Sequence, residues 1–556
     1  MNKKYNQRTT HVYFAFIILF LVISARIFYL QVFRSNFFQN LAQDQRYRLV
    51  KLQGRRGDIL DRKQRILSKS ISCYSVFADP FLIGDPETTA EIISTNLDLP
   101  KENLLYLLKK KKRFVWIKRK ISWEEKEKIK AFKLDGVSFI RDEKRFYPQG
   151  TLSATTLGSV SRDNHGLEGL EFFYNDYLSG KDGWVRVLRD SVSREIIFSP
   201  QIISPQEGAN IVLSLDAQIQ YWVEEYLEKT IKDFRAGSGS AVVMNALNGE
   251  LLALANYPSF DPNQLGKTLP EQMRNRAVAD MFEPGSVFKV VTLLAAVNED
   301  KFADQDKIFC ENGKFKIPGT ILHDWKSYGE LSFREVFMKS SNIGVAKIVQ
   351  SLGVDVFSSY LKRLEFGYPS GIDLPAEAKG SIKPINKWSK TSPYIIPIGQ
   401  EIGVNLLQLA RTFAVAVNGG YLVTPHLVTS ICIQGSCRSV PIQTRKKVIP
   451  TSAANRAKDI LISVVSEGTG KRAQVKGRKI GGKTGTAQKY DPEIKKYSPS
   501  KYRATFVGFI ADLDPPLVIG VTVDEPKRSH FGGVVAAPVF RNIVEKVISY
   551  TEGVGN

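Results

Sequence analysis

The sequence EPGSVFK at residues 283–289 decides how this chain is interpreted, and an apolar run follows it at residues 290–297. Proline and glycine ahead of an apolar run are typical of a helix start. Ser286 and Lys289 are three residues apart. They are therefore predicted to lie on one face of the first helical turn, with Cβ atoms about 5–6 Å apart.

This spacing would place a serine nucleophile beside its own base. A serine hydroxyl is a poor nucleophile unless a neighbouring base takes its proton. A lysine can do so when burial or another cation lowers its pKa, and a helix amino terminus adds partial positive charge where an oxyanion forms. The pattern alone is not specific, because S-x-x-K recurs at Ser359 and at Ser498. A capped core helix would explain Ser286 alone equally well.

Two further motifs follow along the chain. Residues 340–342 are Ser-Ser-Asn, which supply a second hydroxyl and an amide, and residues 481–486 are GGKTGT. Glycines in a strand let another backbone approach closely, and lysine with threonine hydroxyls suits a substrate carboxylate. A turn at Ser340 and a glycine hairpin at Lys483 are the structural alternatives, and S-x-N also occurs at residues 94–96. Only the ordered trio indicates a serine acyl-transfer site.

Composition and charge limit the protein classes that remain. The 556 residues, 43% hydrophobic and 24% charged, indicate an ordinary globular protein, and exclude a wholly disordered, collagen-like or polytopic membrane protein. The net charge of +22 favours an anionic partner. Basic residues are mostly scattered and not interleaved with aromatic ones, so nucleic-acid binding is not predicted. The densest basic run, residues 109–113, is either a contact for anionic lipid or glycan or a solvated helix face.

Near the amino terminus, residues 12–30 are apolar apart from one arginine, and as a helix they would span about 28 Å, close to a bilayer core. A cleaved signal peptide is the alternative. Against cleavage, the bulky Ile23 precedes Ala25, and apolar residues continue beyond it. We therefore predict a cytoplasmic tail at residues 1–11 and a single uncleaved anchor at residues 12–33, although basic residues on both flanks give this orientation little support.

The pattern of predicted strands and helices changes near residue 206. Earlier stretches with β-like or charged helical character lie at residues 74–78, 123–132 and 184–188. Later, a strand at residues 211–215 leads to a helix cap at Asp216 and an amphipathic helix at residues 219–227. Further strands are predicted at residues 240–245, 250–255, 504–510 and 517–523. Strands at both ends with helices between favour one α/β domain whose sheet uses both ends.

The four cysteines include no C-x-x-C, and with five histidines they do not indicate a metal site. Cys432 and Cys437 flank a turn-like stretch between β-prone residues. In an oxidising compartment they could form a disulfide across a hairpin, although the pairing is not determined by the sequence. We expect Cys73 and Cys310 to be buried as small hydrophobic side chains.

The order S-x-x-K, S-x-N, K-T-G resembles that of the penicilloyl-serine transferases, which comprise penicillin-binding proteins and serine β-lactamases. Residues 56–62 (RGDILDR) and 166–171 (GLEGLE) resemble class B penicillin-binding proteins, and residues 531–540 (FGGVVAAPVF) resemble their division-type, FtsI-like members. The similarity covers nearly the whole chain after the predicted anchor. Asn245 stands where the family usually has aspartate and Gln64 where glycine is common, but neither lies in the trio.

The resemblance implies an α/β fold in three parts. These are a single N-terminal transmembrane helix, an elongated α+β pedestal domain of the dimerisation type at residues 34–205, and a penicillin-binding transpeptidase domain at residues 206–550. The last would have an antiparallel sheet flanked by helices. It also implies a bacterial inner-membrane location, with the catalytic domain on the periplasmic side.

The implied activity is that of a peptidoglycan D,D-transpeptidase that β-lactams inhibit and that needs no metal or cofactor. Ser286 would attack the carbonyl between the two terminal D-alanines and form an acyl-enzyme, which an amine of a neighbouring stem would resolve. Lys289 would be the base, with Lys483 helping to keep it neutral. Ser340 would relay the proton to the leaving amine, and Asn342 would hold the substrate amide.

The resemblance also implies the binding groups and partners. Lys483, Thr484 and Thr486, around Gly485, would bind the terminal carboxylate. The backbone N–H groups of Ser286 and Thr486 would form the oxyanion hole. The partners would be peptidoglycan stem peptides, β-lactams, the membrane, an FtsW-type glycan polymerase and other division proteins, with no nucleic acid.

Two alternatives remain. A membrane-bound β-lactamase or carboxypeptidase would pass the acyl group to water, and a β-lactam sensor or silent division scaffold would not be an enzyme. Class A β-lactamases use a glutamate with an asparagine four residues later, and Glu401 with Asn405 has that spacing, in a stretch that resembles the start of a family helix. A sensor would need more membrane spans, and a silent scaffold should have lost part of the trio.

Overall fold

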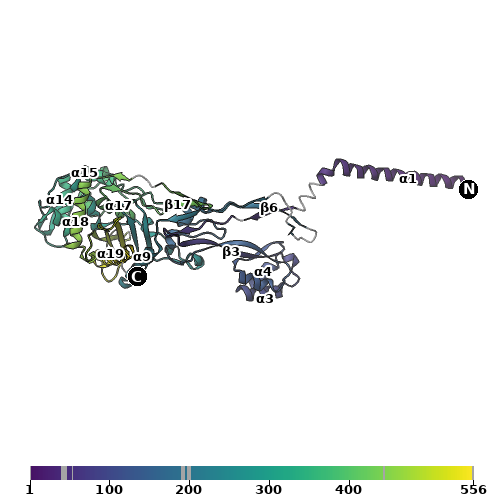
Figure 1. Ribbon diagram of the computed structural model, residues 1–556, viewed down its shortest axis with the longest axis horizontal. Helices are drawn as coiled ribbons and strands as arrows, with labels where there is room; N and C mark the ends of the chain where they lie inside the picture. Colours follow the sequence, from purple (N-terminus) through teal and green to yellow (C-terminus); the bar gives the residue numbers. More distant parts are fainter. Residues whose placement is uncertain are drawn as a thin grey trace. The chain divides into compact units, whose positions relative to one another are not determined.

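The computed structural model (Figure 1) describes residues 2–38, 47–52, 54–189, 195–196, 202–441, 445–491 and 493–553. These residues fall into two compact units. The first comprises Met1–Arg55 and Gly180–Glu207, and the second comprises Arg56–Ser179 and Gly208–Asn556. We describe each unit by itself.

The first unit contains the apolar helix and a small sheet. Helix α1 (Asn2–Phe28) continues into the π-helical turn η1 (Tyr29–Phe33). Within the described residues, one helical stretch, Arg8–Phe33, is long and apolar enough to cross a membrane, in agreement with the predicted anchor. The sheet is antiparallel and comprises β1 (Tyr47–Leu52), β6 (Gly183–Arg189), β7 (Glu195–Ile196) and β8 (Ile202–Ile203).

The second unit begins with a pedestal built on one long strand, β3 (Ile66–Ala78). It pairs with β4 (Val115–Ile121) and β5 (Val137–Phe146). Apolar side chains on one face of these strands pack on α3 (Pro86–Leu97) and α4 (Lys101–Leu108). The predicted charged helix is α5 (Trp123–Lys130), which a Ser122 capping box begins. The same sheet continues through β2 (Ile59–Leu60), β9 (Asn210–Leu213), β17 (Val428–Ile433) and β18 (Ser436–Ser439).

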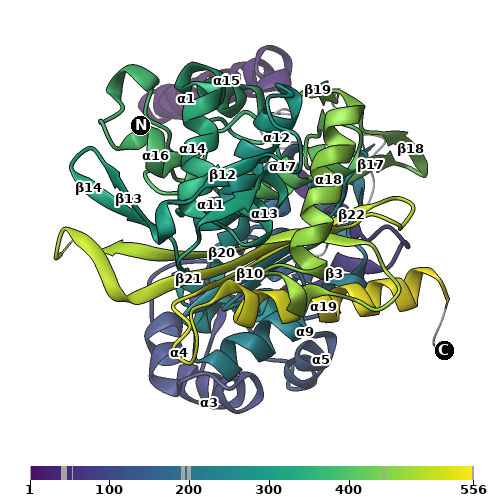
Figure 2. The ribbon, with the colours of Figure 1, turned by 90° about the vertical axis from the view of Figure 1, so that its left-hand side faces the viewer.

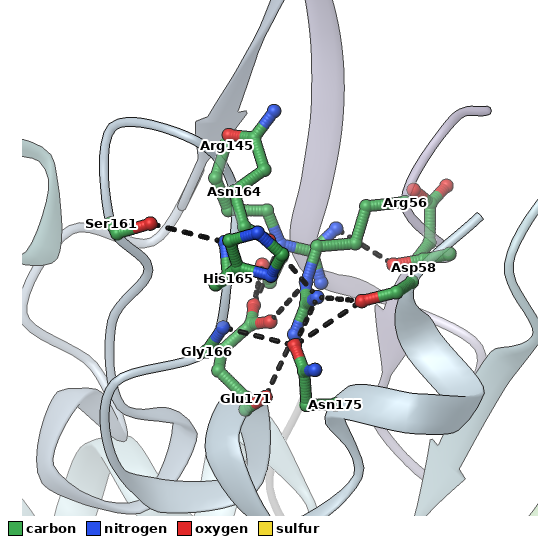
Figure 3. Close-up of polar contacts among 12 residues, drawn as sticks. Arg56, Asp58, Arg145, Ser161, Asn164, His165, Gly166, Glu171 and Asn175 are labelled. Atoms are coloured by element: carbon green, nitrogen blue, oxygen red, sulfur yellow. Dashed lines mark hydrogen bonds and ion pairs between the residues drawn. The ribbon is translucent and has the colours of Figure 1, made fainter. Parts of the chain in front are cut away.

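The motifs at residues 56–62 and 166–171 meet in a buried ionic cluster, which Figure 3 shows in close-up. Glu171 is fully buried, and it accepts from Arg56 Nε at 2.7 Å and from Arg145 Nε at 2.6 Å. Burial alone would raise the pKa of Glu171, but the two guanidinium groups hold it below its ordinary value. Arg56 also donates to the backbone of Asn164 and to Asn175 Oδ1. The cluster therefore joins segments more than a hundred residues apart in the chain.

The larger part of the second unit is organised around a five-stranded antiparallel sheet. Its strands, in spatial order, are β11 (Leu251–Tyr257), β10 (Ser238–Asn245), β22 (Leu517–Asp524), β21 (Lys496–Ile510) and β20 (Ile480–Asp491). All four strands predicted for this sheet are present, and the sheet uses both ends of the domain as expected. On β10, Val242 and Met244 belong to one core and Ala241 and Val243 to the other, because successive side chains point to opposite faces.

Helices cover both faces of this sheet (Figure 2). One face carries α9 (Ala217–Phe234), which Asp216 caps as predicted, and α19 (Gly532–Thr551). The other face carries α12 (Lys289–Asn298), α14 (Asn342–Leu352), α17 (Leu406–Val417) and α18 (Thr451–Ser466). Further helices are α6 (Ala154–Leu157), α7 (Gly169–Phe173), α8 (Asn175–Leu178), α10 (Pro270–Met273), α11 (Arg276–Ala279), α13 (Phe333–Met338), α15 (Val354–Arg363) and α16 (Ser392–Ile395). Further strands are β12 (Lys307–Phe309), β13 (Lys314–Ile317), β14 (Thr320–His323), β15 (Glu330–Ser332), β16 (Tyr421–Leu422) and β19 (Lys446–Lys447).

The predicted disulfide is present. Cys432 and Cys437 are bonded and face each other across the β17–β18 hairpin. Gln434 and Gly435 form its two-residue turn with φ of 49° and 83°, the positive values that a type I′ turn requires. Cys73 and Cys310 are free and buried, as expected.

The two departures from the family pattern keep the local backbone. Gln64 has φ of 62°, the left-handed region in which glycine is common. Asn245 accepts from the backbone N–H of Leu247 through its side-chain oxygen, an interaction that an aspartate would also make.

Candidate active site

Ser286 lies on a 3₁₀ turn, η4 (Gly285–Phe288), immediately before α12. The predicted α-helical first turn is therefore a 3₁₀ turn, in which residues three apart are eclipsed, so Ser286 and Lys289 still share one side. Gly285 has φ of 56°, and its N–H donates to Gly399. A Cβ at this position would lie 2.9 Å from the Thr486 carbonyl oxygen, so η4 and β20 are in close backbone contact.

Lys289 is completely buried, and its amine points to the S-x-N motif. Lys289 Nζ lies 2.6 Å from the Ser340 carbonyl oxygen, 3.2 Å from Ser340 Oγ and 2.8 Å from Asn342 Oδ1. Burial lowers the pKa of Lys289 to about 7, against the opposing charge of Asp324. Near neutral pH, a large fraction of this amine is therefore unprotonated and able to accept a proton.

Ser340 is held between two lysines. Lys483 Nζ lies 2.8 Å from Ser340 Oγ, which Lys289 Nζ also approaches at 3.2 Å. Lys483 is 1% exposed, and burial together with the charge on Lys289 holds the pKa of Lys483 well below its ordinary value. The structure thus brings the first lysine, the second serine and the third motif together around one hydroxyl. Among the described residues, no hydrogen bond joins Ser286 directly to either lysine.

Asp324 fixes the S-x-N turn, and it was not singled out from the sequence. Its carboxylate accepts from Ser341 Oγ at 2.6 Å and from the N–H groups of Asn342 and Ile343. Ser340 has φ of 60°, a conformation that costs free energy for a non-glycine residue unless its surroundings hold it. Asp324 follows β14, 17 residues before Ser341. No local sequence pattern could have revealed this contact, because it depends on tertiary structure.

The K-T-G motif lies on the edge strand β20, as predicted. Gly485 allows close packing against η4, since a Cβ there would lie 2.7 Å from the Pro284 carbonyl oxygen. Lys483 is buried, whereas Thr484 and Thr486 share the partly exposed face of the strand. Thr486 Oγ1 also accepts from the backbone of α19. Of the residues predicted to bind the substrate carboxylate, Lys483 is therefore buried, whereas the hydroxyls of Thr484 and Thr486 lie on a more open face.

The other matches to these motifs do not form a comparable site. Ser359 donates to a backbone carbonyl within α15. Ser498 accepts from the backbone of Lys501, whose amine pairs with Asp491 near the surface. Ser94 donates to the Leu99 carbonyl at the end of α3. Ser94, Ser359 and Ser498 therefore each have a local capping or turn role. This is the non-catalytic role that was considered for the three motifs.

The sheet with helices on both faces and a serine between two buried lysines define a serine acyl-transferase of the penicillin-binding type. Residues 239–545 match the penicillin binding protein transpeptidase domain, and residues 51–213 match the penicillin-binding protein dimerisation domain. The chain belongs to the class B penicillin-binding proteins.

Individual relatives resemble the chain over almost its full length. It is 33% identical to the probable peptidoglycan D,D-transpeptidase PenA of Neisseria gonorrhoeae, over 97% of this chain and 92% of that protein. It is 30% identical to the peptidoglycan D,D-transpeptidase FtsI of Buchnera aphidicola, over 96% and 93%. The structure of penicillin-binding protein 3 from Mycobacterium tuberculosis, complexed with aztreonam, superposes with a TM-score of 0.72 at 28% identity, covering 91% of this chain and 98% of that one.

Proposed function

We propose that this chain is a peptidoglycan D,D-transpeptidase that cross-links stem peptides during septal cell-wall synthesis and that β-lactams acylate and inhibit. The observation that carries the proposal is the Ser340 hydroxyl between the amines of Lys289 and Lys483. Both amines are buried, and no carboxylate of the described residues forms an ion pair with them. This arrangement supports proton transfer between neutral and charged forms at neutral pH.

In the first half-reaction, Ser286 Oγ bonds to the carbonyl carbon between the two terminal D-alanines, and its proton passes to Lys289. Collapse of the tetrahedral intermediate breaks the C–N bond. Ser340 delivers a proton from the lysine pair to the leaving nitrogen, and free D-alanine departs. Asn342, which accepts from Lys289 through Oδ1 and donates from Nδ2 to the His323 carbonyl, would hold the substrate amide with the second Nδ2 hydrogen.

In the second half-reaction, the amine of a neighbouring stem attacks the ester carbonyl. The C–O bond to Ser286 breaks, and the amine proton returns to the serine oxygen through the same lysine. The close contact of η4 with β20 supports an oxyanion hole made by the N–H groups of Ser286 and Thr486. Thr484 and Thr486, on the open face beside Gly485, would bind the terminal carboxylate, and Lys483 would add positive charge behind them.

Rapid hydrolysis of the acyl-enzyme is not supported by the surroundings of Glu401. Its carboxylate accepts from Ser392 Oγ at 2.6 Å. Asn405 caps α17 with its oxygen and donates its amide to the Ala378 carbonyl, so it has no free group to hold a water beside Glu401. We therefore expect an amine, and not water, to be the productive acceptor.

The test is a competition between two acceptors. Full-length protein in detergent is incubated with a stem-peptide donor ending in D-Ala-D-Ala and with increasing concentrations of an amine acceptor. The proposal predicts a cross-linked product that rises with amine concentration, and none with Ser286→Ala. Release of free acid at a rate that the amine does not change would instead identify a carboxypeptidase.

We also propose the arrangement across the membrane and the domain limits. Residues 1–11 would form a cytoplasmic tail, residues 12–33 the anchor, residues 34–205 the pedestal and residues 206–550 the catalytic domain, on the periplasmic side. The apolar surface of Arg8–Phe33 supports the anchor. Protease added to spheroplasts should digest the large domain. Survival of that domain until the membrane is permeabilised would reverse the orientation.

The division role rests on residues 531–540 and on the similarity to FtsI. We propose recruitment by an FtsW-type glycan polymerase, with paired anchor helices as the contact, together with other division proteins. Depletion should block septation and give filaments or enlarged undivided cells. Rounded cells with normal septa would point to elongation instead.

A further inference from the structure

One face of the pedestal sheet exposes a group of aromatic rings. On β3 and β4, the buried side chains Val76, Ala78, Val115 and Ile117 point to the helices of the pedestal core. Phe77 and Trp116 alternate with them, are directly paired across the two strands, and so occupy the opposite face. Phe114 stacks on Phe77 with ring centroids 4.9 Å apart and meets Trp116 edge-on at the same distance.

These rings remain open to solvent. Phe114 is 44% exposed, Trp116 is 40% exposed, and Phe81, three residues after β3, is 60% exposed. We call Phe77, Phe114 and Trp116, whose rings contact one another, the aromatic face. Contiguous exposed apolar surface of this kind is uncommon on soluble proteins and marks interaction sites. The aromatic face has no part in the acyl-transfer chemistry described above.

Cations surround the aromatic face. The guanidinium of Arg113 lies 5.6 Å from the Phe81 ring centre, and that of Arg119 lies 5.4 Å from the Trp116 ring centre. Lys110 similarly covers Tyr106 on α4. In the described part of the chain, residues 110–113 form no ion pair, whereas Lys109 pairs with Glu87. The basic run of the sequence therefore adjoins the rings and keeps most of its charge available.

We propose that the aromatic face and residues 110–113 bind an uncross-linked peptidoglycan strand, an acidic glycan; this inference rests on the proposed function. The C–H faces of sugar rings carry partial positive charge and suit the negative faces of Phe114 and Trp116. Stem peptides carry free carboxylates, which residues 110–113 would pair with. Phe77, Phe114 and Trp116 pack on one another on the face of a sheet, which suits a sugar ring laid across them better than insertion into lipid acyl chains.

The test is co-sedimentation with insoluble peptidoglycan sacculi. Full-length Ser286→Ala protein in detergent is used, so that binding is measured without acyl transfer. In that background, the charge variant Lys110→Gln/Lys111→Gln/Lys112→Gln/Arg113→Gln and the aromatic variant Phe114→Ser/Trp116→Ser should each bind about tenfold more weakly. Higher salt should weaken the binding of the parent protein to sacculi, and should have less effect on the binding of the charge variant.

The matched control removes the same charge from α5 and the residues after it, with Lys126→Gln/Lys128→Gln/Lys130→Gln/Lys133→Gln. Figure 2 shows α5 apart from α4, and this control should bind like the parent. Equal loss in the control, or no loss in the charge variant, would overturn the proposal. So would binding to phosphatidylglycerol vesicles without binding to sacculi.

The charge variant changes three exposed side chains and the half-buried Lys110, none of them in the core, so it decides the outcome even if the aromatic variant does not fold. Fluorescent penicillin labelling of the otherwise wild-type protein and variants gives a separate readout. Labelling without binding to sacculi would refute the glycan site alone, and binding without labelling would refute the proposed function alone.

Discussion

Two groups of buried charge among the described residues, one in the pedestal and one in the catalytic domain, are built differently. In the pedestal, the fully buried Glu171 bonds to both Arg56 and Arg145. In the catalytic domain, Lys289 and Lys483 are as deeply buried, but they share the Ser340 hydroxyl, and no carboxylate in the described part of the chain forms an ion pair with either. The paired cluster holds distant segments together. The unpaired one lowers the pKa of both amines, that of Lys289 to about 7, and so favours proton transfer near neutral pH.

The difference follows from the cost of burying charge. A buried ion is tolerated when opposite charges and hydrogen bonds compensate it, and otherwise its pKa shifts toward the neutral form. The charge of Asp324 raises the pKa of Lys289, which burial lowers. The hydrogen bonds of the Asp324 carboxylate, however, go to the S-x-N turn. The fold thus positions the two lysines without giving them an ion pair, which would have kept both amines protonated.

The largest expected effect concerns the unpaired cluster. Lys289→Ala should reduce acylation by penicillin almost as completely as Ser286→Ala, by about 10⁴-fold or more, because nucleophile and base act as a unit. Stopped-time labelling with fluorescent penicillin measures it. Lys362→Ala, in the S-x-x-K match on α15, is the control and should label normally. A Lys289→Ala protein that labels within tenfold of wild type would remove Lys289 as the base.

Substitution in the Arg56–Glu171–Arg145 cluster should instead change the free energy of unfolding. Glu171→Ala leaves two guanidinium groups buried without their carboxylate, so it should lower the free energy of unfolding by about 3–5 kcal/mol. Lys289→Met removes a buried amine and keeps the volume, so it should be neutral or stabilising. Urea unfolding of the two variants compares them. Equal destabilisation by both would erase the distinction between the clusters.

The pKa of Lys289 gives a signed pH dependence. Acylation needs the neutral amine, so with a pKa of about 7 the rate should fall as pH falls, by about 100-fold two pH units lower. In the unfolded chain the lysine has its ordinary pKa of 10.5 and binds more protons, so the unfolding free energy should rise from pH 7 to 10.5. Acylation rates across pH 5–9 test the first point. A rate that is flat down to pH 5 would contradict it.

Asp324→Asn should have a smaller, double effect. Loss of the carboxylate weakens the S-x-N turn and should slow acylation by about tenfold. It also removes the charge that raises the pKa of Lys289, so the pH limb should move to lower pH. A slower reaction with an unmoved limb would mean that Asp324 acts only through the turn. Asp306→Asn is the matched control, because Asp306 accepts from the backbone of Ala303 away from this turn.

The smallest expected effect is that of Glu401→Ala. Because Glu401 is bonded to Ser392 and Asn405 is fully used as a cap, the lifetime of the penicillin adduct should remain long and largely unchanged. Adduct decay after removal of free penicillin is the measurement. Fast turnover of penicillin by the wild-type protein, abolished by this substitution, would identify a β-lactamase.

Much of the fold could be predicted from the sequence because the signals are local. Apolar, β-prone runs located β10, β11, β22 and the second half of β21, and the Gly435 turn indicated the disulfide hairpin. Of the three motifs, Lys289 and Lys483 both lie within hydrogen-bonding distance of Ser340, while the roles assigned to these residues stay predictions. The Asp324 contact and the Arg56–Glu171 pair could not be predicted by local rules, because tertiary packing alone brings these residues together. The 3₁₀ turn at Ser286 was likewise missed, since its contact with β20 is non-local.

The central claim is that Ser286 forms the acyl-enzyme, and intact-protein mass spectrometry after incubation with penicillin tests it most directly. The account predicts a mass increase equal to one intact penicillin, located by peptide mapping on the segment that contains Ser286, and persisting after free penicillin is removed. No adduct, or an adduct located on Ser340 or Ser359, would contradict it.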